Sequence, residues 1–341
     1  MPRLLIVSDA WHPQVNGVVR SLETVGRVLG QRHFDVHYLT PDRFWSVPLP
    51  SYPEIKISMP SLRALDAHID ALGPDHIHIA TEGPLGLAAR GYCVTRGLAF
   101  TTSYHTRFPE YVAARLPVPV GWSYGYLRWF HAAARRTMVP TPSVLRDLRR
   151  RFFRRLAIWS RGVDVHAFSP GPKTMFEALP GPHLLYVGRV AVEKNIEDFL
   201  TLDHPGTKIV VGDGPRREAL SARYGNVVFT GTLKGSALRD AYRSADALVF
   251  PSRTDTFGNV IVEAMACGTP VAAYPVMGPI DIIGKDQGGA TDVDLVAATR
   301  GALATSRRAA LARAGDFSWD AAADQFAANL VPCRAALKVA A

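Results

Sequence analysis

The fold of this 341-residue chain is decided by residues 251–268, Pro-Ser-Arg-Thr-Asp-Thr-Phe-Gly-Asn-Val-Ile-Val-Glu-Ala-Met-Ala-Cys-Gly. This stretch follows the short apolar run Ala247–Phe250, which we predict to be a buried strand. It begins as a polar loop and continues as an apolar helix. A strand, a loop and a helix in this order are typical of a parallel α/β sheet, in which functional groups follow the carboxyl ends of the strands.

Two acidic residues in this stretch are candidates for a ligand site. Asp255 lies in the loop near the helix start, where an acid gains up to about 1 kcal/mol, so a purely structural role stays open. Glu263 lies about two turns inside the helix among apolar residues, and a buried carboxylate there needs a partner such as a sugar or ribose hydroxyl. The alternative is that Glu263 faces solvent. The helix start also presents backbone N–H groups, those of Thr256, Phe257, Gly258 and Asn259.

Short apolar runs alternate with helical stretches on both sides of this segment. In the first half the predicted strands are Leu4–Val7, Val36–Leu39, His76–Ile79, Ala99–Ser103 and Met138–Pro140. In the second half they are His183–Val187, Lys208–Val211, Val227–Thr230, Ala247–Phe250 and Pro270–Ala273. Such alternation favours parallel sheets, and two successive series separated by a Pro- and Gly-rich stretch indicate two domains.

We therefore expect an α/β protein with two Rossmann-like, doubly wound domains that face a cleft. The first domain is predicted over residues 1–168, the linker over 169–182 and the second domain over 183–317. A terminal helix, within 318–341 and with Ser318 as its N-cap, is expected to pack on the first domain. Ligands of doubly wound sheets bind beyond the carboxyl ends of the strands.

Three other loops after predicted strands resemble phosphate-binding loops. In 188–195, Gly188 is followed by Arg189 and, five residues later, by Lys194. The planar guanidinium of the arginine and the compact ammonium group of the lysine could together neutralise a diphosphate. The alternative is that both are ordinary surface cations. Gly17 opens a helix after the first strand and lets an anion approach backbone N–H groups, although a plain turn is the alternative. In 211–215, Pro215 removes a donor, so we interpret that loop as a tight turn.

Composition excludes several classes of protein. The chain is 48% hydrophobic and 20% charged, which is typical of a folded protein rather than a disordered one. Its three cysteines fit neither a disulfide framework nor a zinc site and indicate a reducing compartment. We find no apolar run long enough to span a membrane and no signal peptide, so we expect a cytoplasmic protein.

The positive charge is concentrated in one window. The formal net charge is +9, and residues 128–161 contain ten arginines and one acid, Asp147. Aromatic residues interleave with the arginines, as at a membrane surface, where each basic residue gains about 1 kcal/mol on anionic lipid. The alternative is a solvated face, and no nucleic-acid motif accompanies the window. The residues expected to contact membrane or acceptor are Trp122, Trp129, Arg149, Arg150, Arg151, Arg154 and Arg155.

These motifs resemble those of the GT4 retaining glycosyltransferases of GT-B fold, over nearly the whole chain. The family signature is a pair of acids separated by seven residues, which stands here as Asp255 and Glu263. The resemblance implies that Glu263 binds the ribose of a nucleotide and Asp255 the hydroxyls of the transferred sugar. It implies a diphosphate clamp of Arg189 and Lys194. It further assigns Gly17 to a glycine loop, His105 to the donor sugar, and Gly231 and Leu233 to the base pocket.

Within the family the chain is similar to glycosyl-diacylglycerol synthases and to GDP-mannose-dependent α-mannosyltransferases. The resemblance implies retaining transfer of a hexose from a nucleotide diphosphate sugar, with a UDP-sugar favoured over a GDP-sugar. We expect a membrane lipid acceptor, first of all diacylglycerol, at the cytoplasmic face of a membrane. The alternatives are mannosyl transfer to a phosphoinositide, a polyprenyl carrier or a soluble glycan, a nucleotide-sugar epimerase, and a non-catalytic binder.

No metal site is predicted. The histidines and acids lack the spacings of a metal cluster, and the matched motifs lack an Asp-x-Asp metal site. Asp292 and Asp294 have that spacing but are interpreted as the N-cap region of a late helix. The expected enzyme therefore uses its nucleotide-sugar donor without a cofactor.

Overall fold

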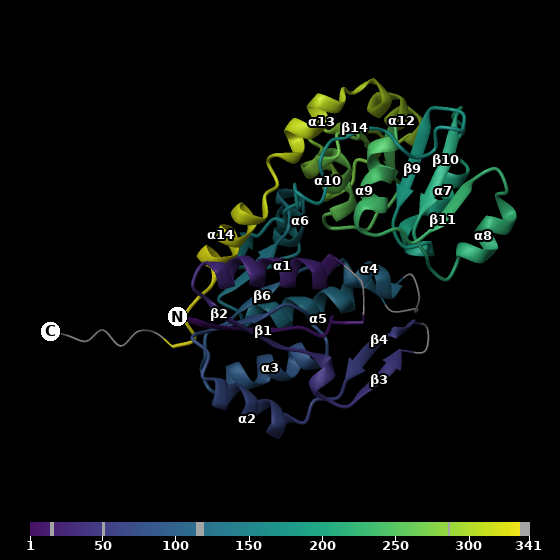
Figure 1. Cartoon of the computed structure of the whole chain (residues 1–341). Coiled ribbons are helices and arrows are strands. Elements are labelled where there is room, and N and C mark those ends of the chain that lie inside the picture. The colour runs from purple at the N-terminus through teal and green to yellow at the C-terminus, as the bar shows by residue number, and fades with distance from the viewer. Residues whose placement is uncertain (14–16, 50–51, 114–118, 286, 335–341) are drawn as a thin grey trace. The chain divides into compact units, whose positions relative to one another are not determined.

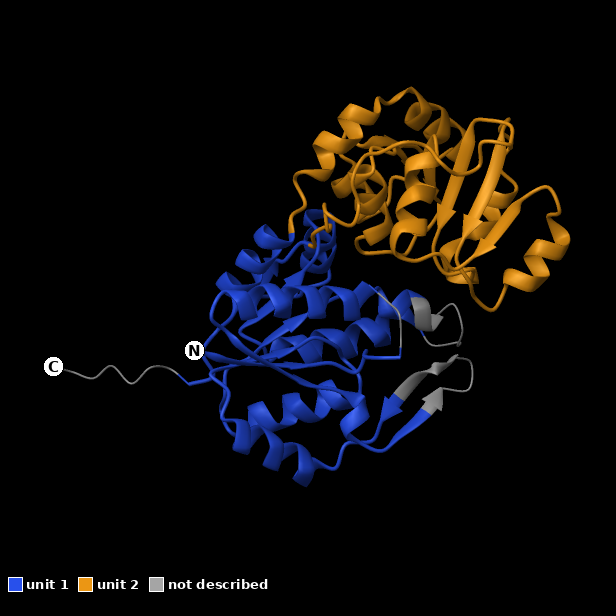
Figure 2. Ribbon diagram, in the orientation of Figure 1, with its two compact units in different colours: residues 1–160, 319–341 blue, residues 161–318 orange. Residues whose placement is uncertain are grey.

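The computed structural model describes residues 1–13, 17–49, 52–113, 119–285 and 287–334, and its chain forms two compact units (Figure 2). Unit 1 contains residues 1–160 and 319–341, and unit 2 contains residues 161–318. Each unit has a six-stranded parallel sheet with helices on both faces. The predicted fold class, two doubly wound α/β domains, is confirmed.

The sheet of unit 1, of which Figure 1 labels β1, β2 and β6, has the strand order β2-β1-β5-β6-β7-β8. Its strands are β1 (Arg3–Val7), β2 (Asp35–Leu39), β5 (His76–Ile79), β6 (Thr101–Ser103), β7 (Arg136–Val139) and β8 (Leu156–Ile158). Leu4 of the central strand β1 pairs with Val36 on one side and with His76 on the other. The apolar run of β1 is completely buried, because helices cover both faces of a parallel sheet.

Helices cover the two faces of this sheet in separate groups. The helices of unit 1 are α1 (Gly17–Gln31), η1 (Pro41–Arg43), α2 (Leu62–Leu72), α3 (Pro84–Thr95), α4 (Phe108–Ala113), α5 (Val120–Ala132), α6 (Pro142–Arg150) and α14 (Trp319–Asn329). Leu5 of β1 packs toward α2, α3 and α5, whereas Leu4 and Ile6 pack toward α1 and α14. Phe326 of α14 places its ring against Trp159, so the last helix is part of this core. A hairpin of β3 (Ser46–Leu49) and β4 (Tyr52–Ser58), like β8, was not predicted.

The sheet of unit 2 has the strand order β11-β10-β9-β12-β13-β14. Its strands are β9 (His183–Val187), β10 (Thr207–Val211), β11 (Val228–Gly231), β12 (Ala247–Phe250), β13 (Val271–Ala273) and β14 (Gly289–Thr291). The chain therefore reverses its direction of winding between β9 and β12, which pair at Leu185 and Leu248. Such a reversal is the point at which doubly wound sheets leave a crevice for a ligand.

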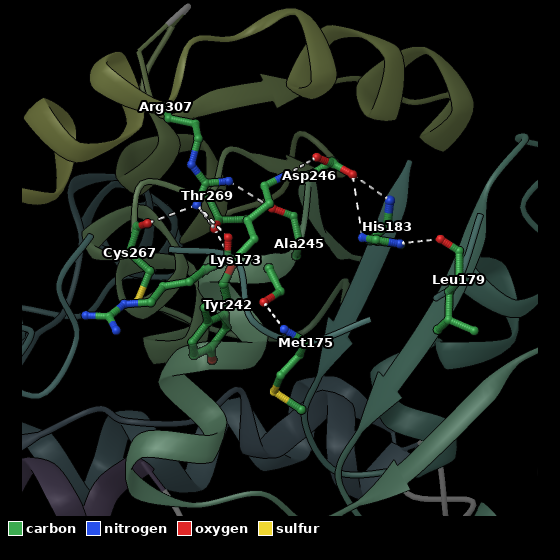
Figure 3. Close-up of polar contacts among 12 residues, drawn as sticks. Lys173, Met175, Leu179, His183, Tyr242, Ala245, Asp246, Cys267, Thr269 and Arg307 are labelled. Carbon is green, nitrogen blue, oxygen red and sulfur yellow. Dashed lines mark hydrogen bonds and ion pairs between the residues drawn. The ribbon is translucent and has the colours of Figure 1, made fainter. Parts of the chain in front are cut away.

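The helices of unit 2 also form two layers. They are η2 (Val192–Lys194), α7 (Ile196–Leu200), α8 (Arg217–Arg223), α9 (Gly235–Ser244), α10 (Asn259–Ala266), α11 (Pro279–Ile283), α12 (Leu295–Ala304) and α13 (Arg307–Ala314). One core joins α9, α10 and α13 to one face of the sheet, and a second joins α7, α8 and α12 to the other face. Arg307 of α13 ties this first layer together by donating to the carbonyls of Ala245, Arg243 and Cys267 (Figure 3).

The predicted linker, residues 169–182, lies within unit 2, and the chain divides after Ser160 rather than at residue 168. Polar contacts explain this difference. Asp246, just before β12, pairs with Lys173 and accepts a hydrogen bond from the His183 amide (2.7 Å; Figure 3). The Met175 amide donates to Ser244 Oγ (2.9 Å). The Pro- and Gly-rich composition therefore marks a segment without helix or strand that is fastened to the second sheet.

Candidate functional site

The site that the sequence predicts begins at the reversal point of unit 2. The loop after β9 carries Gly188, Arg189 and Lys194, and the loop after β12 carries Asp255. Because β9 and β12 are neighbours in a parallel sheet, their carboxyl ends bring these two loops together.

Lys194 and Asp255 form the central contact between the two loops. Lys194 Nζ lies 2.6 Å from Asp255 Oδ1 and 2.9 Å from Oδ2. The two side chains are 22% and 19% exposed, so the pair is largely withdrawn from water but reachable by a ligand. Asn195, at φ 51°, joins η2 to α7 immediately after the lysine. A cation and a carboxylate side by side suit a ligand with both a phosphate group and hydroxyl groups.

The loop of Gly188 and Arg189 is held by the neighbouring loop after β10, residues 211–215. The amide of Gly188 donates to the carbonyl of Val211 (3.0 Å), and the amide of Val190 donates to that of Asp213 (2.9 Å). Gly212 has φ 142°, and a Cβ at this position would lie 1.9 Å from the carbonyl oxygen of Gly188. The glycines of 211–215 therefore let this turn approach the Arg189 loop, which agrees with its interpretation as a tight turn. Arg189 itself is half-buried.

Glu263 is buried in α10, with 4% of its surface exposed, so it does not face solvent. Tyr242 of α9 donates its hydroxyl to Glu263 Oε2 at 2.9 Å. The sequence predicted that this carboxylate needs a partner, and the structure supplies one of its partners from within the unit.

The start of α10 carries the other predicted donor-binding residues. Thr256 and Phe257 are buried, Gly258 precedes the helix at φ 88°, and Asn259 is its first residue. The backbone at this point is closely packed, because a Cβ on Gly278 would lie 2.8 Å from the carbonyl carbon of Thr256.

The predicted base-pocket residues lie farther along the sheet. Gly231 ends β11, two strands away from β9, and its carbonyl accepts the amide of Gly212 (2.8 Å). Leu233 follows it and is partly buried against the core of unit 2. A nucleotide whose base reaches these residues would cross the end of β10 on its way from Lys194.

Sequence reasoning missed two groups beside Asp255. Arg161 is buried, and its guanidinium lies 5.9 Å from the centre of the Phe257 ring. Burial lowers the pKa of Arg161 to about 10, and the charge of Asp255 opposes this shift. Arg253 stacks on the ring of Tyr274 at 3.6 Å, and the Tyr274 hydroxyl donates to Asp198 (2.8 Å). The signal for the first was the sequence Arg-Gly-Val-Asp at 161–164, which resembles the interdomain segment of the family but was given no role at the site.

The predicted residues of the first domain lie in unit 1. His105 follows β6, is 7% exposed and sets its ring against Trp159, with the ring centres 5.5 Å apart. Gly17 is the first residue of α1. Another polar residue, Asp9, follows β1 and accepts the amides of Leu85 and Gly86 (2.7 and 3.1 Å), so this carboxylate caps α3.

The predicted membrane surface is divided. Trp122 (77% exposed) and Trp129 (51%) lie seven residues apart on one side of α5. Tyr124, on the opposite side of α5, packs under the guanidinium of Arg151 at 4.0 Å. The tryptophans therefore lie on the side of α5 opposite the Arg151 contact. Arg149, Arg150 and Arg154, near the end of α6, are exposed, and so is Phe152 (77%) between them in the sequence.

Two of the predicted arginines have internal partners. Arg151 pairs with Asp147 (2.9 Å), and Arg155 donates to the carbonyl of Ala134 (3.0 Å). None of the helices in the described parts of the chain is both long and apolar enough to cross a bilayer.

Acidic and histidine side chains do not gather at a metal centre: residues 1–13, 17–49, 52–113, 119–285 and 287–334 hold no group of three or more suitable ligands. Asp294 Oδ1 accepts the amide of Val296 (2.9 Å), so this residue is the N-cap of α12, as predicted. Asp292 in turn accepts the amide of Asp294 (2.9 Å).

Comparison with known proteins places this architecture in a family. Residues 15–167 match the profile of Glycosyltransferase Family 4, and residues 181–312 match that of Glycosyl transferases group 1. A GDP-mannose-dependent alpha-mannosyltransferase of Mycolicibacterium smegmatis is 30% identical over 91% of each chain. The chain belongs to glycosyltransferase family 4. It is a nucleotide-sugar-dependent glycosyltransferase.

Other relatives of this family 4 enzyme differ in the activity that their names state. Sulfoquinovosyl transferase SQD2 of Arabidopsis thaliana is 32% identical over 78% of the chain, and the chain spans about half (52%) of that relative's length. Sucrose-phosphate synthase of Thermosynechococcus elongatus has the same fold, with a TM-score of 0.78 and 22% identity over 96% of this chain and 98% of its own. The fold is GT-B, as the resemblance implied.

Proposed function

We propose that this enzyme transfers a hexose from a nucleotide diphosphate sugar, preferentially a UDP-sugar, to a hydroxyl group of a membrane lipid, with retention of anomeric configuration. Diacylglycerol is the acceptor that we favour. The observation that carries the proposal is the Lys194–Asp255 pair at the reversal point of unit 2, because it joins a phosphate ligand and a hydroxyl ligand in one place.

The chemistry follows from the charges of this site. The bond between the sugar C1 and the diphosphate oxygen breaks, and its electron pair stays on that oxygen. Arg189 and Lys194 stabilise the developing charge together with the amides at the start of α10. Each such donor lowers the barrier by about 3–4 kcal/mol. The acceptor oxygen bonds to C1 on the same face, and its proton passes to an oxygen of the leaving phosphate.

The other residues bind and orient the donor. Glu263 accepts from the ribose hydroxyls and Asp255 from the hydroxyls of the sugar, and both are buried enough to hold one geometry. By family membership we assign His105 to the sugar, Gly17 and Gly188 to the diphosphate, and Gly231 and Leu233 to the base. The cations of the clamp take the place of a metal, so transfer proceeds in EDTA.

The lipid acceptor requires contact with a membrane, and we assign this contact to the end of α6. Arg149, Arg150 and Arg154 together contribute about 3 kcal/mol on anionic lipid, and Phe152 supplies an apolar tip. Co-sedimentation with phosphatidylglycerol vesicles tests this contact. Neutralising the three arginines should abolish binding at low salt, whereas Trp122→Ala with Trp129→Ala should not. If the wild type does not bind these vesicles at low salt, the lipid acceptor is excluded.

A second candidate is α-mannosyl transfer from GDP-mannose. It is favoured by the M. smegmatis relative with that stated activity, which this chain matches over 91% of its length. One assay separates the candidates: release of nucleotide from UDP-glucose, UDP-glucuronate and GDP-mannose, with and without diacylglycerol vesicles. Lipid-stimulated release from a UDP-sugar supports the first proposal, and release from GDP-mannose alone supports the second. Binding without turnover, or epimerisation without an acceptor, contradicts both.

A further inference from the structure

A cavity with a volume of about 1000 Å³ lies in unit 1, at the amino ends of β6 and β7. The carboxyl ends of these strands, where Tyr104 and Val139 lie, are at the opposite edge of the sheet. Within unit 1, the cavity therefore lies at the opposite edge of the sheet from the loop after β6 that carries His105.

Four arginines line this cavity: Arg96, Arg135, Arg136 and Arg334. The cavity has one acidic lining residue, Asp70, within the described residues. Asp70 already accepts a hydrogen bond from the Tyr92 hydroxyl (2.6 Å) and lies 4.0 Å from Arg96. The lining is thus strongly positive.

Two of these four arginines, Arg96 and Arg136, are fixed in place by contacts within the unit. Arg96 donates to Asp66 (3.0 Å), and its guanidinium lies 4.1 Å from the centre of the Tyr92 ring. Arg136 donates to the carbonyl of Ala328. These two side chains therefore have internal roles and define the shape of the cavity.

Arg135 and Arg334 have no such role. Both are exposed, and neither guanidinium has a hydrogen-bond or ion-pair partner among the residues that the structure describes. Arg135 is not needed to cap α5, because Arg90 donates to the carbonyl of Phe130 (3.0 Å) and Arg155 to that of Ala134 (3.0 Å). The positive charges around this cavity repel one another, and a bound anion would offset that repulsion.

The remaining wall is held by the backbone. The amide of Cys333 donates to the carbonyl of Asp75 (2.8 Å), and the amide of Ala99 donates to that of Cys333 (2.9 Å). His76 Nδ1 lies 2.9 Å from the carbonyl oxygen of Val331. The cavity is therefore bounded by main chain on this side, and hydrogen bonds hold the backbone next to Arg334 in place.

We propose that this cavity binds the phosphate group of a phosphate ester. Arg135 and Arg334 bind the phosphate oxygens, since guanidinium forks match phosphate geometry, while Leu98 and Pro332 give the ester an apolar wall. The ester is a free phosphorylated metabolite or the headgroup of an anionic lipid. The site does not depend on which sugar or acceptor the enzyme uses.

Site-resolved arginine labelling with phenylglyoxal, read by mass spectrometry, tests this proposal. Glycerol 3-phosphate should slow the labelling of Arg135 and Arg334 but not of Arg27 and Arg308, which are exposed on α1 and α13. Protection by glycerol 3-phosphate in solution indicates a free ester, and protection only by phosphatidylglycerol vesicles, not by phosphatidylcholine vesicles, indicates a lipid headgroup. Either result supports the site. Equal labelling of all four arginines with every probe overturns it.

Variants provide the second measurement. Arg135→Ala with Arg334→Ala should raise the concentration of the effective probe that half-protects Arg96 and Arg136 by about a hundredfold, about tenfold for each lost charged hydrogen-bond donor. Arg27→Ala with Arg308→Ala removes the same net charge and should change this concentration less than twofold. Equal changes for the two pairs contradict a built site. If the first pair does not fold, Arg135→Gln alone should give about a tenfold change.

Discussion

Replacing Lys194 by methionine should slow sugar transfer by about 10²–10³-fold in kcat, because it removes a cation aimed at the leaving diphosphate. The same change should lower the free energy of unfolding by about 1–3 kcal/mol, since it leaves the Asp255 carboxylate, 19% exposed, without its partner at 2.6 and 2.9 Å. Nucleotide release under saturating donor gives the first quantity, and denaturant unfolding gives the second.

A double-mutant cycle with Asp255→Asn separates catalysis from stability. The double variant should recover most of the lost stability, because neither member of the Lys194–Asp255 pair remains charged without the other, yet it should recover no activity. Lys173→Met is the matched control: it breaks another Lys–Asp pair of unit 2, with Asp246, and should leave kcat unchanged. The reasoning is refuted if Lys194→Met keeps kcat within about threefold of the wild type, or if the double variant regains activity together with stability.

Three further changes have defined outcomes. Glu263→Gln should raise the donor KM about tenfold, as expected for one lost hydrogen bond to a charged group, while Tyr242 keeps its acceptor; steady-state kinetics measures this. Gly212→Ala should lower the free energy of unfolding by about 1–3 kcal/mol, because its Cβ would lie 1.9 Å from the Gly188 oxygen; urea denaturation measures this. Burial lowers the pKa of His78 to about 3, so unfolding takes up a proton below the ordinary value of 6.5, and stability should fall by about 5 kcal/mol between pH 6.5 and 3. His78→Asn should flatten that part of the stability profile.

The sequence predicted those features that depend on local pattern. Ten strands were located from short apolar runs, and the apolar surroundings of Glu263 correctly indicated its burial. The loops after β9 and β12 were identified because glycine, arginine and lysine there follow buried strands. A local pattern was sufficient in each case, since strand period and chain order fix which loops share an edge of a parallel sheet.

The sequence predicted that the last helix packs on the first domain, but several other features that depend on packing between distant segments were not predicted. Asp255 was assigned to a ligand, but its partner Lys194 is 61 residues away in sequence. The sequence did not indicate which aromatic residues of α5 face the arginines, because packing decides that Tyr124 lies under Arg151 while Trp122 and Trp129 are exposed. The arginine cavity of unit 1 joins Arg96, Arg135 and Arg334, which no sequence window contains.

A structure of the enzyme with a bound nucleoside diphosphate tests the central claim most directly. The diphosphate should lie beyond the carboxyl ends of β9 and β12, within hydrogen-bond distance of the Arg189 and Lys194 side chains, with Glu263 on the ribose. A diphosphate bound away from both cations, or a ribose that makes no contact with Glu263, would contradict the assignment of this site.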